Sequence, residues 1–437
     1  MLRARAKLDL DRQIGAICPL IFGQFVEHLG RCVYGGIYEE GSALADEDGF
    51  RTDVLAAVAE LGPPIVRYPG GNFVSGYRWL DGVGPKDRRP SRWDRAWKTV
   101  ETNRFGTNEF IQWCRRVGSE PYICVNLGDG TPTEAANWLE YCNAATETHF
   151  AELRRAHGFD QPHNVRYWGL GNELYGPWQI GSKDAATYAA VALDAARSMR
   201  AVDRQIKLVA VGYNGQPDWN STVLRALWDQ IDYLALHVYL GCEQLESHLA
   251  SGLIVEHHVR QMRSAIEMVA AERFSDRPVR IAFDEWNVFY RAGQPAHEER
   301  YDLADALVVA QFLNVMIRHC DMVTLANMAQ LVNVLAPIFT SPSGLFRQSI
   351  YWPLWLYRRT LAGVGLDVFC DGPTYRAPVH LTRRHAPERD VPVLDLAGGF
   401  DQPGRRVCLA VVNRSPDRPV ELTIDGIDLS ARGQAWM

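Results

Sequence analysis

The sequence predicts an α/β protein: a closed (β/α)8 barrel, or TIM barrel, with a C-terminal antiparallel β-sandwich domain that also takes the N-terminal strand. Three observations lead to this prediction. Short apolar runs alternate eight times with segments of helical periodicity, which is the pattern of a barrel of parallel strands. After about Leu356 the helical periodicity fades and short strand-like runs follow one another. The segment Arg3–Leu10 alternates and precedes the first barrel strand, so we expect it to pair with these later strands.

The eight expected barrel strands are short, mostly apolar runs. They are Ile21–Val26, Ile65–Tyr68, Pro121–Leu127, Val165–Leu170, Lys207–Val211, Tyr233–His237, Val279–Phe283 and Met322–Ala326. Between them, apolar residues recur with the spacing of one helix face. The clearest of these helical segments are Val54–Leu61, Asn108–Val117, Thr133–Asn143, Ala185–Met199, Val255–Ala271 and Leu303–His319. Thr107 and Thr131 precede two of them and are expected helix starts, because threonine is a favoured N-cap residue.

An open, doubly wound sheet is the alternative fold. Such sheets commonly carry a glycine-rich phosphate loop after a strand. The segment Gly169-Leu-Gly171-Asn-Glu-Leu174 does not match that loop, because Leu174 occupies the third glycine position. The closed barrel is therefore favoured, and in such barrels active sites lie at the C-terminal ends of the strands.

We divide the chain into residues 1–17, a strand joining the sandwich, residues 18–358, the barrel, and residues 359–437, the sandwich. The expected sandwich strands are Val379–Thr382, Val393–Leu396, Val407–Val412 and Val420–Ile424. Turn residues such as Gly398-Gly399 separate them. No closing strand is obvious after Ser430, so the sandwich looks several strands short.

Bulk properties indicate an ordinary globular protein. The chain has 437 residues, 47% of them hydrophobic and 22% charged, which fits one large domain and a smaller one. A net charge of −6 gives no reason to expect a nucleic-acid partner. The N-terminus lacks the apolar segment of a signal peptide, and no apolar stretch could span a bilayer. Nine scattered cysteines without a C-x-x-C pair indicate free thiols, so we expect a cytoplasmic protein with no membrane partner.

Two glutamates stand out. Glu173 closes the run Arg166-Tyr-Trp-Gly-Leu-Gly-Asn-Glu173, and Glu285 follows Val279-Arg-Ile-Ala-Phe-Asp284. Each ends an apolar run that predicts a buried strand, and neither has a neighbouring lysine or arginine on its C-terminal side. A carboxylate at the end of a buried strand is costly unless it is paired or used. Two of them on different strands suit the cleavage of a glycosidic bond.

Other polar residues fall at the same ends of the expected strands. They are Glu27 and His28 after the first strand, Arg67 to Asn72 after the second, Asn126 after the third, Asn172 beside Glu173, His237 and Tyr239 after the sixth, Asp284 beside Glu285, and Asn327 and Gln330 after the eighth. Amides and acids hold sugar hydroxyls, and aromatic rings cover the apolar faces of a sugar. The set contains few cations that could hold a phosphate. It therefore predicts a sugar site.

Each of these residues also has a structural interpretation. A single strand-end Asn or Gln is more often a turn or core polar residue, and Gly70-Gly71 could be a tight turn. Trp93, Trp97 and the basic stretch Lys86–Arg95 could form a surface loop. Glu256-His257-His258 fits a solvated helix face, and no segment has metal-ligand spacing, so we expect no metal and no cofactor. The joint position of so many polar residues at one end favours the functional interpretation.

Several motifs resemble one known family. They are Arg67-Tyr-Pro-Gly-Gly-Asn72, Asp81-Gly-Val-Gly-Pro85, Glu101-Thr-Asn103, Phe105-Gly106-Thr107, Gly171-Asn-Glu173, Gly176-Pro-Trp-Gln-Ile-Gly181, Asp284-Glu-Trp286 and Asn327-Met-Ala-Gln-Leu-Val-Asn333. In this order they are similar to the intracellular α-L-arabinofuranosidases of glycoside hydrolase family 51. The resemblance runs from about residue 18 to residue 360 and more weakly to residue 415. It implies the same barrel and sandwich, and usually a homo-oligomer, a hexamer.

The resemblance also implies roles for individual residues. Glu173 corresponds to the acid/base and Glu285 to the nucleophile. The implied sugar contacts are Glu27, Asn72, Asn172 and Gln330, with His237 and Tyr239 near the nucleophile, and Trp97 and Trp178 complete our set of expected substrate-binding residues. Two departures from the family pattern lie nearby. Leu174-Tyr175 stands where Met-Asp is common, and the segment His237–Cys242 lacks an arginine of the commoner sequence.

The sequence therefore predicts a retaining exo-glycosidase that removes terminal α-L-arabinofuranosyl units from arabino-oligosaccharides. One alternative is a retaining glycosidase of the same architecture that acts on another furanoside, such as a galactofuranoside, or on a xyloside or glucan. Another is a catalytically silent sugar-binding barrel. For a retaining acid, we expect the pKa of Glu173 to be raised by an apolar setting near Trp168 or Tyr175. We expect Glu285 to stay ionised and to accept a hydrogen bond from Tyr239.

Overall fold

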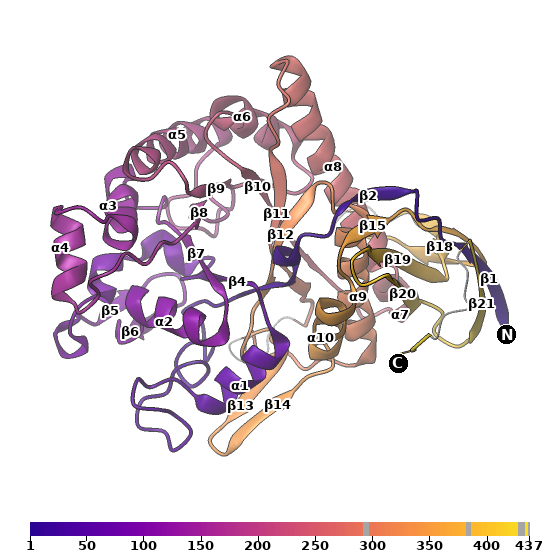
Figure 1. Ribbon diagram of the computed structural model, residues 1–437, viewed down its shortest axis with the longest axis horizontal. Helices are drawn as coiled ribbons and strands as arrows, with labels where there is room; N and C mark the ends of the chain where they lie inside the picture. The colour runs from indigo at the N-terminus through magenta and orange to yellow at the C-terminus, as the bar shows by residue number, and fades with distance from the viewer. Residues whose placement is uncertain (292–296, 382–385, 427–432, 436–437) are drawn as a thin grey trace.

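The computed structural model describes residues 1–291, 297–381, 386–426 and 433–435. Its largest part is a closed barrel of eight parallel strands that neighbour one another in chain order (Figure 1). The strands are β3 (Gly23–Phe25), β4 (Ile65–Tyr68), β7 (Glu120–Cys124), β8 (Tyr167–Leu170), β9 (Lys207–Ala210), β10 (Tyr233–Leu240), β11 (Arg280–Val288) and β12 (Val323–Ala329). The predicted barrel is confirmed, and all eight expected strands overlap an observed one.

Helices surround the barrel and cover the outer faces of its strands (Figure 1). They are α1 (Thr52–Leu61), α2 (Thr107–Val117), α3 (Pro132–Asn143), α4 (His149–Ala156), α5 (Ala185–Val202), α6 (Pro217–Leu227), α7 (Leu245–Leu249), α8 (Ser251–Glu272), α9 (Leu303–Arg318) and α10 (Tyr351–Thr360). The six expected helical segments are present. Helices α4, α6, α7 and α10 were not among the predicted segments.

Local sequence explains where the best-defined helices begin and end. Thr131 caps α3: its hydroxyl oxygen accepts a hydrogen bond from the backbone N–H of Glu134, whose carboxylate accepts one from the backbone N–H of Thr131. Helix α2 starts at Thr107, but the expectation that Thr107 caps it is wrong: the N-cap residue is Gly106, whose backbone N–H donates to the Glu109 carboxylate at 2.9 Å. Helix α2 ends at Gly118, which has a φ of 74° and therefore adopts the left-handed conformation that glycine takes without strain.

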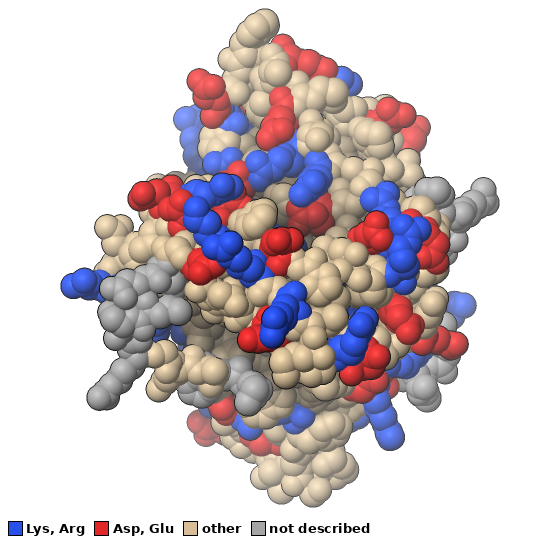
Figure 2. Space-filling model, turned by 90° about the vertical axis from the view of Figure 1, so that its right-hand side faces the viewer, with Lys and Arg blue, Asp and Glu red and all other residues tan. Residues whose placement is uncertain are grey.

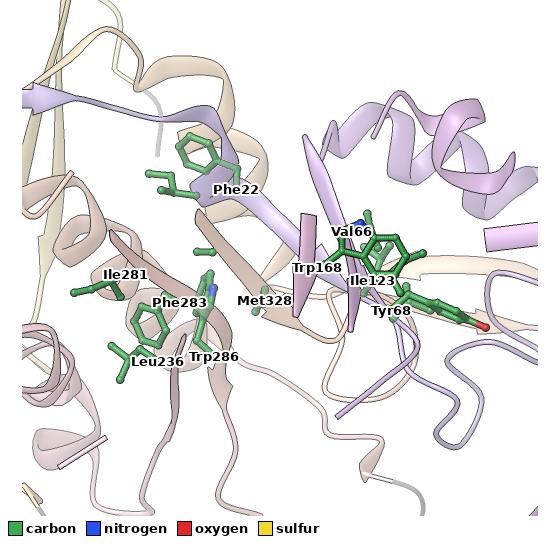
Figure 3. Packing of buried hydrophobic residues seen from close by; sticks show 14 of the residues in the cluster. Phe22, Val66, Tyr68, Ile123, Trp168, Leu236, Ile281, Phe283, Trp286 and Met328 are labelled. Atoms are coloured by element: carbon green, nitrogen blue, oxygen red, sulfur yellow. The ribbon is translucent and has the colours of Figure 1, made fainter. Parts of the chain in front are cut away.

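Side chains of the barrel strands alternate between two environments. Val66, Ile123 and Trp168 point outward into the core between strands and helices (Figure 3). The residues one position before or after them point inward. Ile65, Tyr122, Tyr167, Val209, Ala235, Ala282 and Leu325 form a separate apolar cluster that fills the barrel. The next inward position along β4 after Ile65 is Arg67, so the inside of the barrel becomes polar toward the carboxyl ends of the strands.

Strand β11 contains an irregularity that shapes the polar layer. Ala235 of β10 pairs with Ala282 of β11, and His237 pairs with Glu285. Two steps along β10 therefore match three steps along β11, which is the mark of a β-bulge. The extra residue lets both Asp284 and Glu285 reach polar partners on the inside of the barrel, where strict alternation would place only one of them.

The N-terminal strand belongs to the C-terminal region. β1 (Leu2–Lys7) pairs in parallel with β21 (Val420–Asp425) and antiparallel with β16 (Phe369–Asp371). A second, four-stranded sheet has the order β2–β15–β19–β20, from β2 (Gln13–Ala16), β15 (Val364–Leu366), β19 (Leu394–Asp401) and β20 (Arg406–Asn413). The remaining hairpins are β5 (Arg92–Asp94) with β6 (Thr99–Glu101), β13 (Ile338–Ser341) with β14 (Gly344–Arg347), and β17 (Thr374–Pro378) with β18 (Glu388–Pro392).

A buried carboxylate joins the C-terminal sheets to the barrel. Asp395 of β19 accepts hydrogen bonds from Arg318 and Asn314 of α9, at 2.9 Å each, and pairs with the buried Arg414 at 2.9 Å. The charge is shared among groups from both parts of the chain. Removal of one partner would leave a buried charge uncompensated, so this cluster fixes how β19 sits on α9.

Two expectations for the outer parts of the fold are wrong. The strand expected at Val379–Thr382 lies earlier, because the observed strand β17 ends at Pro378; Thr382 itself lies outside the described residues. The helix face with Glu256 and His258 is not solvated. The Glu256 carboxylate accepts a hydrogen bond from Nε2 of His319 at 2.6 Å, and His258 is buried. Burial opposes the charge of Glu256, but the hydrogen bond from His319 and the charges of Arg318 and Arg260 lower its pKa to about 2.

The surface that carries the C-terminal sheets has charges of both signs. Figure 2 shows that lysine and arginine side chains are interspersed there with aspartate and glutamate side chains. Several form exposed ion pairs, such as Arg3 with Glu421. All nine cysteines are free thiols. Among the described residues, no helix is both long enough and apolar enough to cross a membrane.

Candidate active site

The expected site residues come together at the carboxyl ends of the barrel strands. Glu27 follows β3, Asn72 follows β4, Asn172 and Glu173 follow β8, His237 and Tyr239 lie on β10, Glu285 lies on β11, and Gln330 follows β12. Trp97 lies in the turn of the β5–β6 hairpin and Trp178 in the loop after β8. Because eight strands converge here, residues far apart in the sequence become neighbours.

Glu285 is buried, and three potential donors lie close to its carboxylate. Nη1 of Arg67 donates to Oε1 at 2.7 Å, and the Tyr239 hydroxyl donates to Oε2 at 3.0 Å. Nδ1 of His237 lies 3.4 Å from Oε2. Both oxygens thus accept hydrogen bonds from fixed donors, which orients the group for attack as a nucleophile. The predicted hydrogen bond from Tyr239 is confirmed.

Glu173 lies beside different partners. The Tyr175 hydroxyl and Nδ1 of His237 each lie 3.0 Å from Oε1, and the indole N–H of Trp178 donates to Oε2 at 3.0 Å. The backbone of Glu173 adopts a φ of 43°, which turns the side chain into the site directly after β8. Tyr175 is near Glu173 as expected, whereas the Trp168 indole donates instead to the Val165 carbonyl in the outer core.

The two glutamates are close to one another. One oxygen of Glu173, one oxygen of Glu285 and a ring nitrogen of His237 all lie within 4.8 Å of each other. This proximity of one oxygen from each group is compatible with the short separation of the two carboxyl groups in retaining glycosidases, about 5–5.5 Å.

The same three residues are the group in the described part of the chain that could hold a metal ion. Their atoms are already engaged, however. Arg67 and Tyr239 donate to the oxygens of Glu285, and Tyr175 and Trp178 donate to those of Glu173. A cation would compete with the buried Arg67 for the same carboxylate. This donor set therefore fits hydrogen bonding to a substrate better than coordination of a metal.

The charge on His237 governs the proton balance of the site. Burial alone would lower the pKa of His237, but the neighbouring carboxylates of Glu285, Asp284 and Glu173 raise it to about 10. Burial likewise opposes the charge of Glu173, but hydrogen bonds from His237, Trp178 and Tyr175 hold its pKa below the ordinary value. The expected raised pKa of Glu173 is thus wrong. The proton that an acid would need lies on His237, 3.0 Å from Oε1 of Glu173.

Glu27 organises a second part of the site. Its Oε1 accepts hydrogen bonds from the backbone N–H of Phe73 at 3.1 Å and the indole N–H of Trp97 at 3.0 Å. Its Oε2 accepts from Nε2 of Gln330 at 2.9 Å. Burial, together with the nearby charge of Glu285, raises the pKa of Glu27 to about 7. The loop that carries Trp97 is therefore hydrogen-bonded directly to a residue at the carboxyl end of β3.

Asn172 and Asn72 differ in their burial and in their hydrogen bonds to other residues. Oδ1 of the buried Asn172 accepts from Nη2 of Arg67 at 2.6 Å, whereas its Nδ2 has no hydrogen-bond partner in the described chain. A buried donor without a partner is rare and suits a ligand acceptor. Asn72 is half-buried and lies between Gly71 and Phe73, which face Glu285 and Glu27 respectively.

Sequence reasoning placed Arg67 and Asp284 at strand ends but assigned them no role. Arg67 is 1% exposed and links Glu285, Asn172 and the Asp284 backbone carbonyl. Asp284 accepts a hydrogen bond from the Tyr122 hydroxyl at 2.7 Å and lies 3.3 Å from Nε2 of His237. The alternation of inward and outward side chains along the strand could have indicated a role for Arg67. Arg67 is the next inward residue after Ile65 on a buried strand, and a cation buried there requires carboxylate partners.

The arrangement can perform two-step substitution at an acetal carbon. It offers one carboxylate paired with Arg67 and a second carboxyl group, hydrogen-bonded to His237, with an oxygen within 4.8 Å of the first. Asn172 adds a donor that has no partner among the described residues. Exposed aromatic surface from Trp178, 57% exposed, borders the second carboxyl group. An apolar sugar face could pack there.

Family comparisons agree with this geometry. The family model described as "Alpha-L-arabinofuranosidase 1 domain" matches residues 57–251, which carry Asn172 and Glu173. The model described as "Alpha-L-arabinofuranosidase C-terminal domain" matches residues 284–435, which begin at the Asp284-Glu285 pair.

Individual relatives are similar over almost the whole chain. The intracellular exo-α-(1→5)-L-arabinofuranosidase of Halalkalibacterium halodurans is 40% identical over 444 residues, covering 97% of this chain and 87% of its own length. The probable α-L-arabinofuranosidase C of Aspergillus clavatus is 40% identical, covering 95% and 86%. The crystal structure of an α-L-arabinofuranosidase from Thermotoga maritima in complex with arabinose is 41% identical, with a TM-score of 0.90 and coverage of 97% and 88%.

Proposed function

Because the chain belongs to the α-L-arabinofuranosidases of glycoside hydrolase family 51, we propose that it removes terminal α-L-arabinofuranosyl units from arabino-oligosaccharides by double displacement. Glu285 is the nucleophile and Glu173 the acid/base in this proposal. The observation that carries it is the pair of carboxyl groups within 4.8 Å, of which only Glu285 is bonded to the buried Arg67.

In the first step, a carboxylate oxygen of Glu285 attacks the anomeric carbon while the bond to the leaving oxygen breaks. The leaving oxygen takes a proton from Glu173, and the hydrogen bond between His237 and Glu173 supplies it. Arg67 and Tyr239 orient the attacking carboxylate. The first step produces a glycosyl ester on Glu285 and the free remainder of the oligosaccharide.

In the second step, water attacks the anomeric carbon of the ester and Glu173 accepts its proton as a general base. The bond to Glu285 breaks, so arabinose leaves with the configuration of the substrate and Glu285 is again a carboxylate. The proton taken up by Glu173 returns to His237 through their hydrogen bond, which restores the starting state. The lowered pKa of Glu173 suits this step, because a base must be ionised.

The sugar contacts follow from unused or adaptable polar groups. The Nδ2 donor of Asn172 faces the site without a partner and would hold the 2-hydroxyl group. Glu27, Gln330 and Asn72 would hold the other hydroxyl groups, and Trp97 would close over them, because its indole N–H is bonded to Glu27. Trp178 borders the leaving-group side through its bond to Glu173.

We also propose an intracellular location, since relatives from two bacteria carry "intracellular" in their names. A homo-oligomer, a hexamer by family resemblance, is part of the same proposal. Size-exclusion chromatography with light scattering tests the oligomer, and a mass of about 49.2 kDa would contradict it.

A panel of aryl glycosides tests the activity itself. The proposal predicts that the α-L-arabinofuranoside is hydrolysed with a kcat/KM at least about a hundredfold above those for the β-D-galactofuranoside, the β-D-xyloside and the β-D-glucoside. Preference for another glycone would reassign the substrate. No turnover of any of them, in protein shown to be folded, would favour a silent sugar-binding barrel.

A further inference from the structure

Tyr175 stands at a position where aspartate is common in the family. Its hydroxyl lies 3.0 Å from Oε1 of Glu173. Its ring lies flat on that of Tyr213, with ring centroids 3.8 Å apart and planes inclined by 4°. Trp219 meets the Tyr175 ring edge-on at 5.7 Å. Tyr175 is thus held on both sides by aromatic groups from the loop after β9 and from α6.

The support under Tyr175 is itself rigid. Oδ1 of Asn220 accepts from the Tyr213 backbone N–H at 2.8 Å, and Nδ2 of Asn220 donates to the Tyr213 carbonyl at 2.9 Å. The Trp219 indole donates to the Val211 carbonyl at 3.0 Å. Two side chains of α6 therefore fix the loop that carries Tyr213, and the stack fixes Tyr175.

The three hydrogen-bond partners of Glu173 differ in whether they can bond its ionised form, its protonated form or both. The indole N–H of Trp178 can only donate, so it bonds the carboxylate form. The imidazole of His237 gives up the proton concerned. A phenol hydroxyl can both donate and accept, so Tyr175 can donate to the ionised carboxylate and accept from the protonated acid.

We propose that Tyr175 is a positioning residue that keeps the Glu173 carboxyl group in one orientation in both halves of the reaction, and that its stack on Tyr213 holds it in place. The inference rests on the proposed acid/base role of Glu173. It explains how a carboxyl group that changes protonation state twice in each cycle keeps its geometry, a condition on which effective catalysis depends strongly.

The pH at which Glu173 titrates tests the role of Tyr175. Other ionisable groups near Glu173 also affect that pH. The groups that face Glu173 are Tyr175 on its own loop, His237 and Tyr239 on β10, and Asp284 and Glu285 on β11, with Arg67 of β4 behind Glu285. In the glycosyl-enzyme Glu285 is esterified and uncharged. The acidic limb of kcat for a substrate limited by the second step then reports Glu173.

The experiment compares the pH dependence of kcat for wild type, Tyr175→Phe and Tyr213→Phe with an aryl α-L-arabinofuranoside whose leaving group needs little protonation. Tyr175→Phe keeps the stack but removes a donor to the carboxylate, so the pKa of Glu173 rises. We expect the acidic limb to move up by about one pH unit and kcat to fall about tenfold. Tyr213→Phe is the matched control and should behave as wild type, because it removes a hydroxyl from the same stack.

Superimposable profiles of Tyr175→Phe and wild type, with rates within twofold, would overturn the inference. If Tyr175→Phe does not fold, Tyr213→Leu decides. It removes the stack and leaves the hydroxyl, so the acidic limb should move in the same direction by a smaller amount, and an unmoved limb would overturn the inference. Absence of turnover in wild type would instead reject the proposed function.

Discussion

A Cβ atom at Gly71 would lie 3.0 Å from Oε1 of Glu285, closer than real Cβ atoms normally approach a neighbour. The backbone at Gly71 does not have a positive φ, so glycine is required here for space and not for conformation. The neighbouring Gly70 meets the same limit, because its Cβ would lie 2.7 Å from Cγ of Glu27. The Gly-Gly pair is therefore more than a tight turn: it lets the backbone pass against two site carboxylates.

The first prediction follows from this contact. Gly71→Ala should lower kcat/KM on an aryl α-L-arabinofuranoside by about one to two decades, because it displaces Glu285 from the attacking position. The melting temperature should change by only a few degrees. Gly433→Ala is the matched control, since a Cβ there meets nothing within 4 Å. If Gly71→Ala and wild type had the same kcat/KM, the observed position of Glu285 would not be required for activity.

The second prediction concerns the buried cation. Arg67→Met should lower the free energy of unfolding by about 3–5 kcal/mol, because Glu285 and Asp284 lose their compensating charge. Adding Asp284→Asn should restore part of the stability by removing one buried negative charge, but not the activity, because Glu285 stays without its donor. Urea unfolding and kinetics of both variants measure this. A single variant as stable as wild type would contradict the assigned role of Arg67.

The third prediction uses the titration of Glu27. Burial raises its pKa in the folded protein from an ordinary 4.5 to about 7. Between these values the native state binds a proton that the unfolded state does not. Glu27 should therefore make the free energy of unfolding fall as pH rises from about 4.5 to 7, by about 3 kcal/mol in all.

Glu27→Gln removes that titration. Unfolding of wild type and Glu27→Gln should be compared at pH 5 and pH 8. Wild type should lose more stability between the two pH values than Glu27→Gln does. Parallel pH dependence of the two proteins would mean that Glu27 is ionised throughout.

The fourth prediction concerns the donor on Asn172. Asn172→Ala should lower kcat/KM by about two decades, because a substrate hydroxyl loses its partner at the transition state. On the matching 2-deoxy substrate, the same substitution should cost much less. The comparison of the two substrates separates two effects of the substitution. One is the loss of the contact between Asn172 and the 2-hydroxyl group, and the other is the loss of the hydrogen bond that Asn172 accepts from Nη2 of Arg67. Equal losses on both substrates would exclude contact with the 2-hydroxyl.

Much of the fold could be predicted because local pattern and tertiary structure agree. Ile65–Tyr68 begins with two β-branched apolar residues, lies between Pro64 and Pro69, and forms β4 with the expected bounds. Helix α6 was missed because Pro217 and four polar residues in its first six positions obscure its periodicity. The face of Glu256 was misjudged because its partners, Arg318 and His319, lie about sixty residues later in the chain.

The candidate site divides in the same way. Glu173 and Glu285 could be singled out because each is a carboxylate at the end of an apolar run. The pKa of Glu173 could not be predicted, because it depends on His237, which lies on β10, two strands away from β8 in the barrel. The role of Tyr175 needed the flat stack on Tyr213, a contact between two loops that sequence spacing does not reveal.

The central claim is that Glu285 is the nucleophile and Glu173 the acid/base. Rescue of alanine variants by azide, with the configuration of the glycosyl azide determined by NMR, tests it most directly. Glu285→Ala should be inactive until azide attacks the anomeric carbon, and its product should have inverted configuration. Glu173→Ala should keep the first step on substrates with good leaving groups, and azide should accelerate the second step to give retained configuration. The opposite pair of products would contradict the assignment by exchanging the two roles.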